Sequence, residues 1–113
     1  MEFDRIEITE ENMGHYMSVI LNRIFSILPT YEQSIKDNNL HTIPSYLDKI
    51  VVEIEGFYIN TKDMERLLSI VNILSTIRDD IQDGKTFSSD DIKSYVFHCI
   101  SIIKRLKVEH GIL

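Results

Sequence analysis

Apolar residues recur at three- and four-residue spacing along most of this sequence, which is the spacing of the buried stripe of an amphipathic helix. The pattern is most regular between Asn60 and Gly84. The apolar positions of this stretch are Met64, Leu67, Leu68, Val71, Leu74, Ile77 and Ile81. The 113 residues include four glycines and two prolines, whereas an all-β fold needs many tight turns. The sequence therefore predicts an all-α protein.

Residues that typically begin and end helices divide the first part of the chain. Thr9 is predicted to cap a first helix whose apolar stripe continues to Leu28, and Pro29 is predicted to end it. Thr30 is predicted to cap a short second helix. That helix is predicted to end near Asn38, because asparagine tolerates the left-handed backbone found after helices.

The last two helices have the clearest boundaries. Asn60 or Thr61 is predicted to cap the fourth helix, and Gly84 follows its last apolar position. Ser88 is predicted to cap the fifth helix, since an aspartate stands three residues later, and Gly111 is predicted to end it.

The middle of the chain and its start leave two alternatives open. Thr42 and Pro44 open a third helix, because proline is favoured in a first turn. Residues 50–58 contain β-branched residues and alternate apolar with acidic positions, which favours a strand. The helical stripe covers more of this segment, so we expect the helix to continue to Tyr58. Residues 1–8 are compatible with a short strand, an extended arm or an extension of the first helix.

Four main helices and one short helix, joined by short loops, predict a compact antiparallel helical bundle. The length predicts a single domain over residues 1–113. Cys99 is the only cysteine in the sequence, so an intramolecular disulfide is excluded. With no secretory leader and no apolar run of about 20 residues, a cytoplasmic protein is expected. The abundance of Ile, Lys, Asp and Asn suggests a bacterial source with an AT-rich genome.

The net charge of −6 restricts the class of partner. An acidic surface repels phosphate backbones and anionic headgroups, so we expect no nucleic acid and no membrane as partners. The excess lies in residues 1–60, which carry ten acidic and four basic residues. A protein partner with a basic surface complements it, and Glu53 and Glu55 are the candidate contacts.

No combination of residues in the sequence indicates a catalytic or metal-binding site. Cys99 belongs to an apolar stripe, and its neighbour His98 points about 100° away on a helix, so the two form no dyad. Glu11 and His15 stand one turn apart but provide two ligands, whereas a zinc site needs three or four. We expect no enzyme activity, no catalytic residues, no cofactor and no metal.

Two charged clusters have ordinary explanations. Three acidic residues at the end of the fourth helix lack calcium-loop spacing and are expected to be solvated: Asp79, Asp80 and Asp83. Three basic residues suit the negative end of the dipole of the fifth helix: Lys104, Arg105 and Lys107.

Several apolar residues remain after the buried stripes are assigned. They are Val19, Leu21 and Phe25 in the first helix, Ile70 and Ile73 in the fourth, and Phe97, Ile100 and Ile102 in the fifth. Either the helices are buried on more than one side, or this surface contacts another chain. We take Tyr95, Phe97 and Ile100 as the candidate partner-binding residues, because aromatic side chains dominate interface energetics.

The sequence therefore favours a small non-catalytic protein-binding module, of the kind that neutralises a toxin as immunity proteins do, or acts as a chaperone. The first alternative is a structural or regulatory homo-oligomer, with a homodimer as the simplest form. The second alternative is a metal- or ligand-binding protein.

Overall fold

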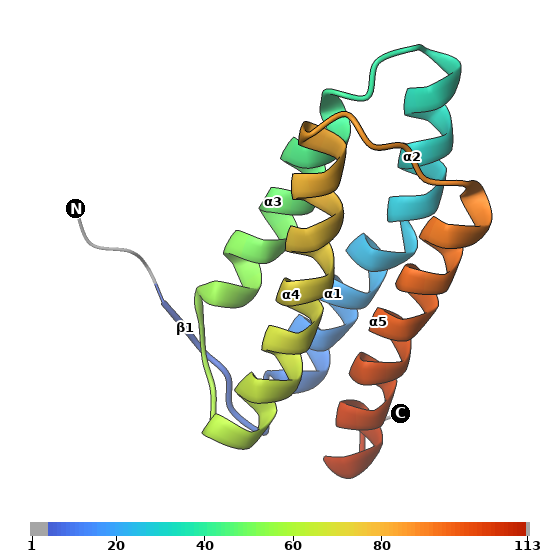
Figure 1. The fold of residues 1–113 in the computed structure, drawn as a ribbon. Helices are drawn as coiled ribbons and strands as arrows, with labels where there is room; N and C mark the ends of the chain where they lie inside the picture. The colour runs from blue at the N-terminus through green and yellow to red at the C-terminus, as the bar shows by residue number, and fades with distance from the viewer. Residues whose placement is uncertain (1–4, 113) are drawn as a thin grey trace.

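The computed structural model describes residues 5–112, and within them the chain forms five α-helices and one pair of very short strands (Figure 1). The elements are β1 (Ile6–Glu7), α1 (Met13–Phe25), α2 (Ile27–Lys36), α3 (Thr42–Glu55), β2 (Phe57–Tyr58), α4 (Thr61–Gln82) and α5 (Ser89–Glu109). α1 and α2 follow one another along one side of the bundle, and α3, α4 and α5 then alternate in direction (Figure 1). The predicted all-α bundle is confirmed.

The break between α1 and α2 lies one turn earlier than predicted. α1 ends at Phe25, and Pro29 is the third residue of α2 and not the end of the preceding helix. A proline ring clashes with the carbonyl group four residues before it, which here belongs to Phe25. In the first turn of α2 the missing N–H of Pro29 has no consequence, because first-turn N–H groups have no partner within the helix. Thr30 accordingly lies inside α2 and does not cap it.

α1 begins at Met13, later than predicted, but Thr9 forms the capping hydrogen bonds expected of it one turn earlier. The backbone N–H of Thr9 donates to Asn12 Oδ1 over 2.7 Å, and the backbone N–H of Asn12 donates to Thr9 Oγ1 over 3.3 Å. These two reciprocal bonds form a turn that precedes the helix.

The ambiguous segment 50–58 is helical up to Glu55 and extended at Phe57–Tyr58, so the predicted helix to Tyr58 is wrong for its last residues. β2 pairs in parallel with β1, with Ile6 opposite Phe57 and Glu7 opposite Tyr58. The N–H of Ile6 donates to Gly56 O over 3.0 Å. Of residues 1–8, Ile6 and Glu7 thus form a strand, whereas Met1–Asp4 lie outside the described residues.

The predicted boundaries of α4 and α5 are confirmed. Asn60 Oδ1 accepts the N–H of Asp63 over 2.9 Å, and Ser88 Oγ accepts the N–H of Asp91 over 3.1 Å. Gly84 has a φ of 90° directly after α4, a conformation that side chains other than glycine rarely adopt.

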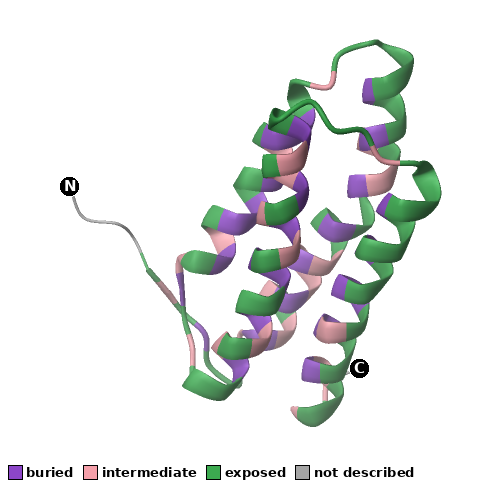
Figure 2. Cartoon of the chain, in the orientation of Figure 1, coloured by how far each residue is buried: buried purple, intermediate pink, exposed green. Residues whose placement is uncertain are grey.

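The core consists of the apolar stripes of all five helices, and Figure 2 shows buried and exposed residues alternating along each of them. α5 packs against α1, α2 and α4, so its buried face is wide. For this reason Ile100, predicted to lie off the main face, is a core residue with 5% exposure. Ile70 of α4 is completely buried for the same reason, because α4 packs against both α3 and α5.

The fully buried Tyr31 joins α2 to the loop between α4 and α5. Its hydroxyl donates to Phe87 O and accepts the N–H of Phe87, each over 2.8 Å. One side chain thereby satisfies both backbone groups of a residue 56 positions away.

We expect Tyr31→Phe to lower the free energy of unfolding by about 1–3 kcal/mol, because it leaves the N–H and C=O of Phe87 without this partner. Urea denaturation followed by circular dichroism measures the change. Tyr58→Phe, at an exposed tyrosine, is the matched control and should leave the midpoint unchanged. Equal midpoints for all three proteins would show that the Tyr31 hydroxyl contributes nothing.

Candidate functional site

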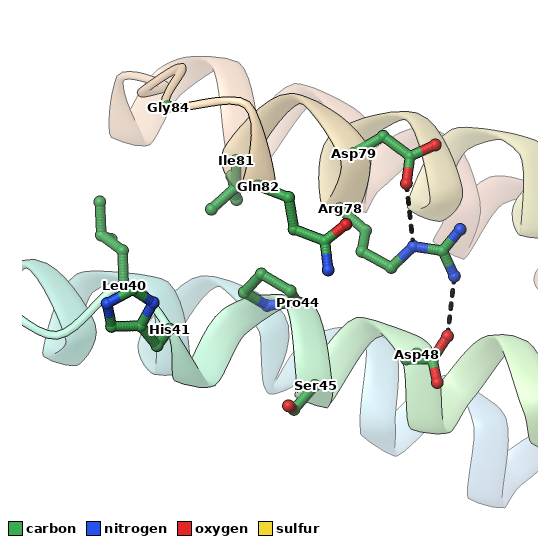
Figure 3. A pocket seen from close by; sticks show the side chains of 10 residues that line it. All are labelled: Leu40, His41, Pro44, Ser45, Asp48, Arg78, Asp79, Ile81, Gln82 and Gly84. Carbon is green, nitrogen blue, oxygen red and sulfur yellow. Dashed lines mark hydrogen bonds and ion pairs between the residues drawn. The ribbon is translucent and has the colours of Figure 1, made fainter.

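A groove between α3 and α4 has a volume of about 660 Å³ (Figure 3). The start of α3 and the residues before it form one wall, and the end of α4 forms the other. The lining residues are Leu40, His41, Pro44, Ser45, Asp48, Arg78, Asp79, Ile81, Gln82 and Gly84.

Arg78 crosses this groove from α4 and is held by two carboxylates (Figure 3). Its Nε lies 3.2 Å from Asp79 Oδ1, and its Nη1 lies 2.7 Å from Asp48 Oδ1 on α3. The hydrogen bonds to Asp79 and then to Asp48 raise the pKa of Arg78 further above its already high usual value, against a smaller opposing effect of burial. The guanidinium therefore stays charged and links the two helices.

The charge of the groove is negative in spite of this arginine. One guanidinium faces two carboxylates, whose side chains are 52% exposed for Asp48 and 60% exposed for Asp79. Asp80, on the next position of α4, is paired with Lys85 over 3.4 Å. The open carboxylate oxygens of Asp48 and Asp79 can accept further hydrogen bonds from a cationic group.

The two predicted acidic contacts lie on different sides of α3. Glu53 pairs with Arg23 of α1, with 3.2 Å between its Oε2 and the arginine Nε. Glu55 is exposed and stands seven residues after Asp48, so both lie on the same face of α3. Glu55 does not line the groove, and Glu53 forms an ion pair with Arg23 of α1.

The predicted apolar contacts on α5 do not form one surface. Tyr95 packs edge-to-face on Phe87, with 6.0 Å between the ring centres. Phe97 is 53% exposed, and Lys93 Nζ lies 5.8 Å from the centre of its ring. Two positions along a helix correspond to about 200°, so Tyr95 and Phe97 point to opposite sides. Ile100 is buried in the core, so it is not available as a partner contact.

The thiol of Cys99 and the possible metal-binding side chains lie in surroundings that do not favour reaction or metal binding. Burial raises the pKa of the Cys99 thiol to about 12, which keeps it protonated and packed as a small apolar side chain. Among residues 5–112, no three His, Cys, Asp or Glu side chains converge in a way that could hold a metal ion. Nor does any described helix combine the length and the apolar character needed to cross a membrane.

A cluster that sequence reasoning missed joins both ends of the described chain to the start of α4. His110 lies between two carboxylates, with Nδ1 3.0 Å from Glu10 Oε1 and Nε2 2.7 Å from Asp63 Oδ2. Asp63 is 3% exposed, and Asn60 Nδ2 also donates to its Oδ2 over 2.6 Å. The spacing of Asn60 and Asp63 is a capping signal, but nothing local indicates His110 as their partner.

The cluster favours the protonated form of His110. Only an imidazolium can donate to both carboxylates at once, because a neutral ring has a single N–H. Burial opposes the charge, but the hydrogen bonds to Asp63 and Glu10 prevail and raise the pKa of His110 above its usual value. A group whose pKa is raised by folding stabilises the protein fully below its unfolded pKa of about 6.5, and loses this effect as the pH rises through the folded value.

We therefore expect His110→Gln to lower the free energy of unfolding by about 1–3 kcal/mol at about pH 6, since Asp63 then loses a charged partner. The difference from the wild type should shrink as the pH rises through the folded pKa of His110. Urea denaturation at a series of pH values between about 6 and 9 measures it.

His15→Gln, at an exposed histidine of α1, controls for the loss of a histidine as such. A difference in the free energy of unfolding between the wild type and His110→Gln that does not change with pH would contradict a charged His110. An equal pH dependence for His15→Gln and His110→Gln would contradict it as well.

Comparison with protein-family models, with curated proteins and with solved structures gives no match to this chain. A function for it therefore has to be inferred from its own side chains and surfaces. Among these, the groove between α3 and α4 offers a concave surface with a defined charge.

Proposed function

We propose that this chain is a non-catalytic binding module whose acidic groove between α3 and α4 receives a lysine or arginine side chain of a protein partner. The observation that carries the proposal is the imbalance of charge in the groove. Asp48 and Asp79 share a single guanidinium and keep much of their surface exposed. A second cation from a partner would complete their hydrogen bonds.

The surroundings of the groove support a protein partner. Val52 and Glu55 follow Asp48 on the outer face of α3, and Val52 is 59% exposed. An exposed apolar side chain between acidic ones matches the composition of an interface, in which apolar contacts provide affinity and charges provide orientation and speed of association.

The size of the groove agrees with this role. A volume of about 660 Å³ accommodates one or two side chains of a partner. The walls are formed by helices, so the carboxylates are held in place before the partner arrives, which reduces the entropic cost of binding. A toxin-neutralising or chaperone-like protein would use such a surface without any chemistry of its own.

Self-association is the alternative, and it would use α5. Phe97 and Val108 are exposed on one side of α5, whereas Tyr95, also exposed, lies on the opposite side and Ile100 is buried. Two exposed apolar side chains about three turns apart provide less apolar area than a stable dimer needs. The acidic groove is therefore the stronger candidate.

The test compares partner capture by a tagged copy of the chain with capture by the double variant Asp48→Asn, Asp79→Asn. We expect the variant to bind the captured partner at least about tenfold more weakly, and the loss to be smaller at high salt, where the charges are screened. The matched control is Glu11→Gln, Glu32→Gln, which removes two exposed charges elsewhere and should bind as the wild type does.

Two results would contradict the proposal. One is a partner whose binding is the same for the wild type and for the Asp48 and Asp79 variant. The other is an equal loss in both double variants, which would mean that the net charge and not the groove controls binding. Charge reversal at Glu53 and Glu55 tests whether the partner instead contacts these two residues. A loss of partner binding confined to that variant would place the contact on the C-terminal half of α3 and not in the groove.

A further inference from the structure

We propose that a second hollow, between α4 and α5, binds a phosphate group. Its volume is about 330 Å³. It is lined by Arg66 and Ser69 of α4 and by His98, Ser101, Ile102 and Arg105 of α5. Five of these six side chains carry hydrogen-bond donors, and none of the six is a carboxylate.

The helical geometry explains why these donors converge. His98, Ser101 and Arg105 are spaced by three and four residues, so they share one face of α5. Arg66 and Ser69 are spaced by three residues on α4. α4 and α5 are antiparallel neighbours, so the two faces meet along a single seam.

The charge of this hollow is opposite to that of the whole chain. Within residues 5–112, neither Arg105 nor His98 forms an ion pair, although the chain as a whole has a net charge of −6. Arg66 pairs with Glu109 through Nη1. The excess positive charge therefore belongs to Arg105.

The donors suit a phosphate group better than a carboxylate. Each guanidinium presents a planar fork that matches two oxygens of a phosphate or of a carboxylate. A planar carboxylate occupies one fork. A tetrahedral dianion has oxygens for the fork of Arg105, for an Arg66 N–H other than those on Nη1, which Glu109 binds, and for a serine hydroxyl, so it uses donors from both walls.

The basic residues near the end of α5 thereby separate into two groups. Lys104 stands next to Arg105 in the chain but points about 100° away, and it does not line the hollow. Arg105 faces the seam with α4, where the dipole of α5 does not explain the additional donors of Arg66 and His98. The hollow shares no lining residue with the groove between α3 and α4, so this proposal does not depend on the proposed function.

The test is a titration of the ¹⁵N-labelled chain with inorganic phosphate, followed by amide chemical shifts in NMR. We expect saturable shifts that centre on Ser69, His98, Ser101 and Arg105. Arg105→Gln should weaken binding about 10–100-fold, as expected for the loss of a charge-assisted contact. Lys104→Gln removes the same charge one position away and should bind as the wild type does.

Titrations with acetate and with O-phosphoserine complete the design. Weaker shifts with acetate than with phosphate support the tetrahedral geometry. Shifts of the same residues by O-phosphoserine also support it, and the tighter of the two phosphates indicates whether the natural ligand is the free ion or a phosphorylated compound. Absence of saturable shifts, equal effects of acetate, or equal losses in Arg105→Gln and Lys104→Gln would each overturn the proposal.

Discussion

The packing of α4 between α3 and α5 is the constraint on which the rest of this structure depends. With 22 residues α4 is about 33 Å long, and both of its flanks are covered by a neighbouring helix. Ile70, Leu74 and Ile77 are buried because of these two contacts. The seams on either side of α4 are also where polar side chains gather. One seam contains Arg78 with its two carboxylates, and the other contains Arg66 and Arg105.

The two seams show why the net charge of a chain is a poor guide to its local surfaces. The total of −6 led to the expectation of a basic partner. The groove between α3 and α4 agrees with that expectation, since Asp48 and Asp79 outnumber Arg78. The hollow between α4 and α5 has the opposite sign because Arg66 and Arg105 lie on facing helices and no carboxylate lines it. The net charge of a chain cannot reveal that acidic and basic residues lie on different surfaces. The spacing of these residues along each helix, combined with the order in which the helices pack, can reveal it.

Much of the fold could be predicted from the sequence because its signals are local. The caps at Asn60 and Ser88 and the left-handed residues at Asn38 and Gly84 depend on side chains within a few residues. The first helix was predicted less well. Pro29 indicated a break, but a proline is accepted inside a first turn, so the break occurs earlier, at Ser26.

The features that could not be predicted depend on contacts between distant residues. The pairing of Ile6 with Phe57 and the contact of His110 with Asp63 need the helices to be placed first. The same applies to Ile100, whose burial results from contacts of α5 with three other helices. Of the candidate site residues, Glu55 shares the face of α3 that carries Asp48, because seven residues along a helix return to the same face. No local signal distinguished it from Glu53.

The contact between Glu10 and His110 also has a consequence for how the chain folds. It joins residues 100 positions apart, and closing so long a loop early would cost the chain much of its entropy with little gained in return. The neighbouring helices α3 and α4 are joined by a short connection and can pair at much lower entropic cost. The histidine contact should therefore form after the rate-limiting step of folding. Interactions formed so late slow unfolding and leave the folding rate almost unchanged, so this contact acts mainly on the lifetime of the native state.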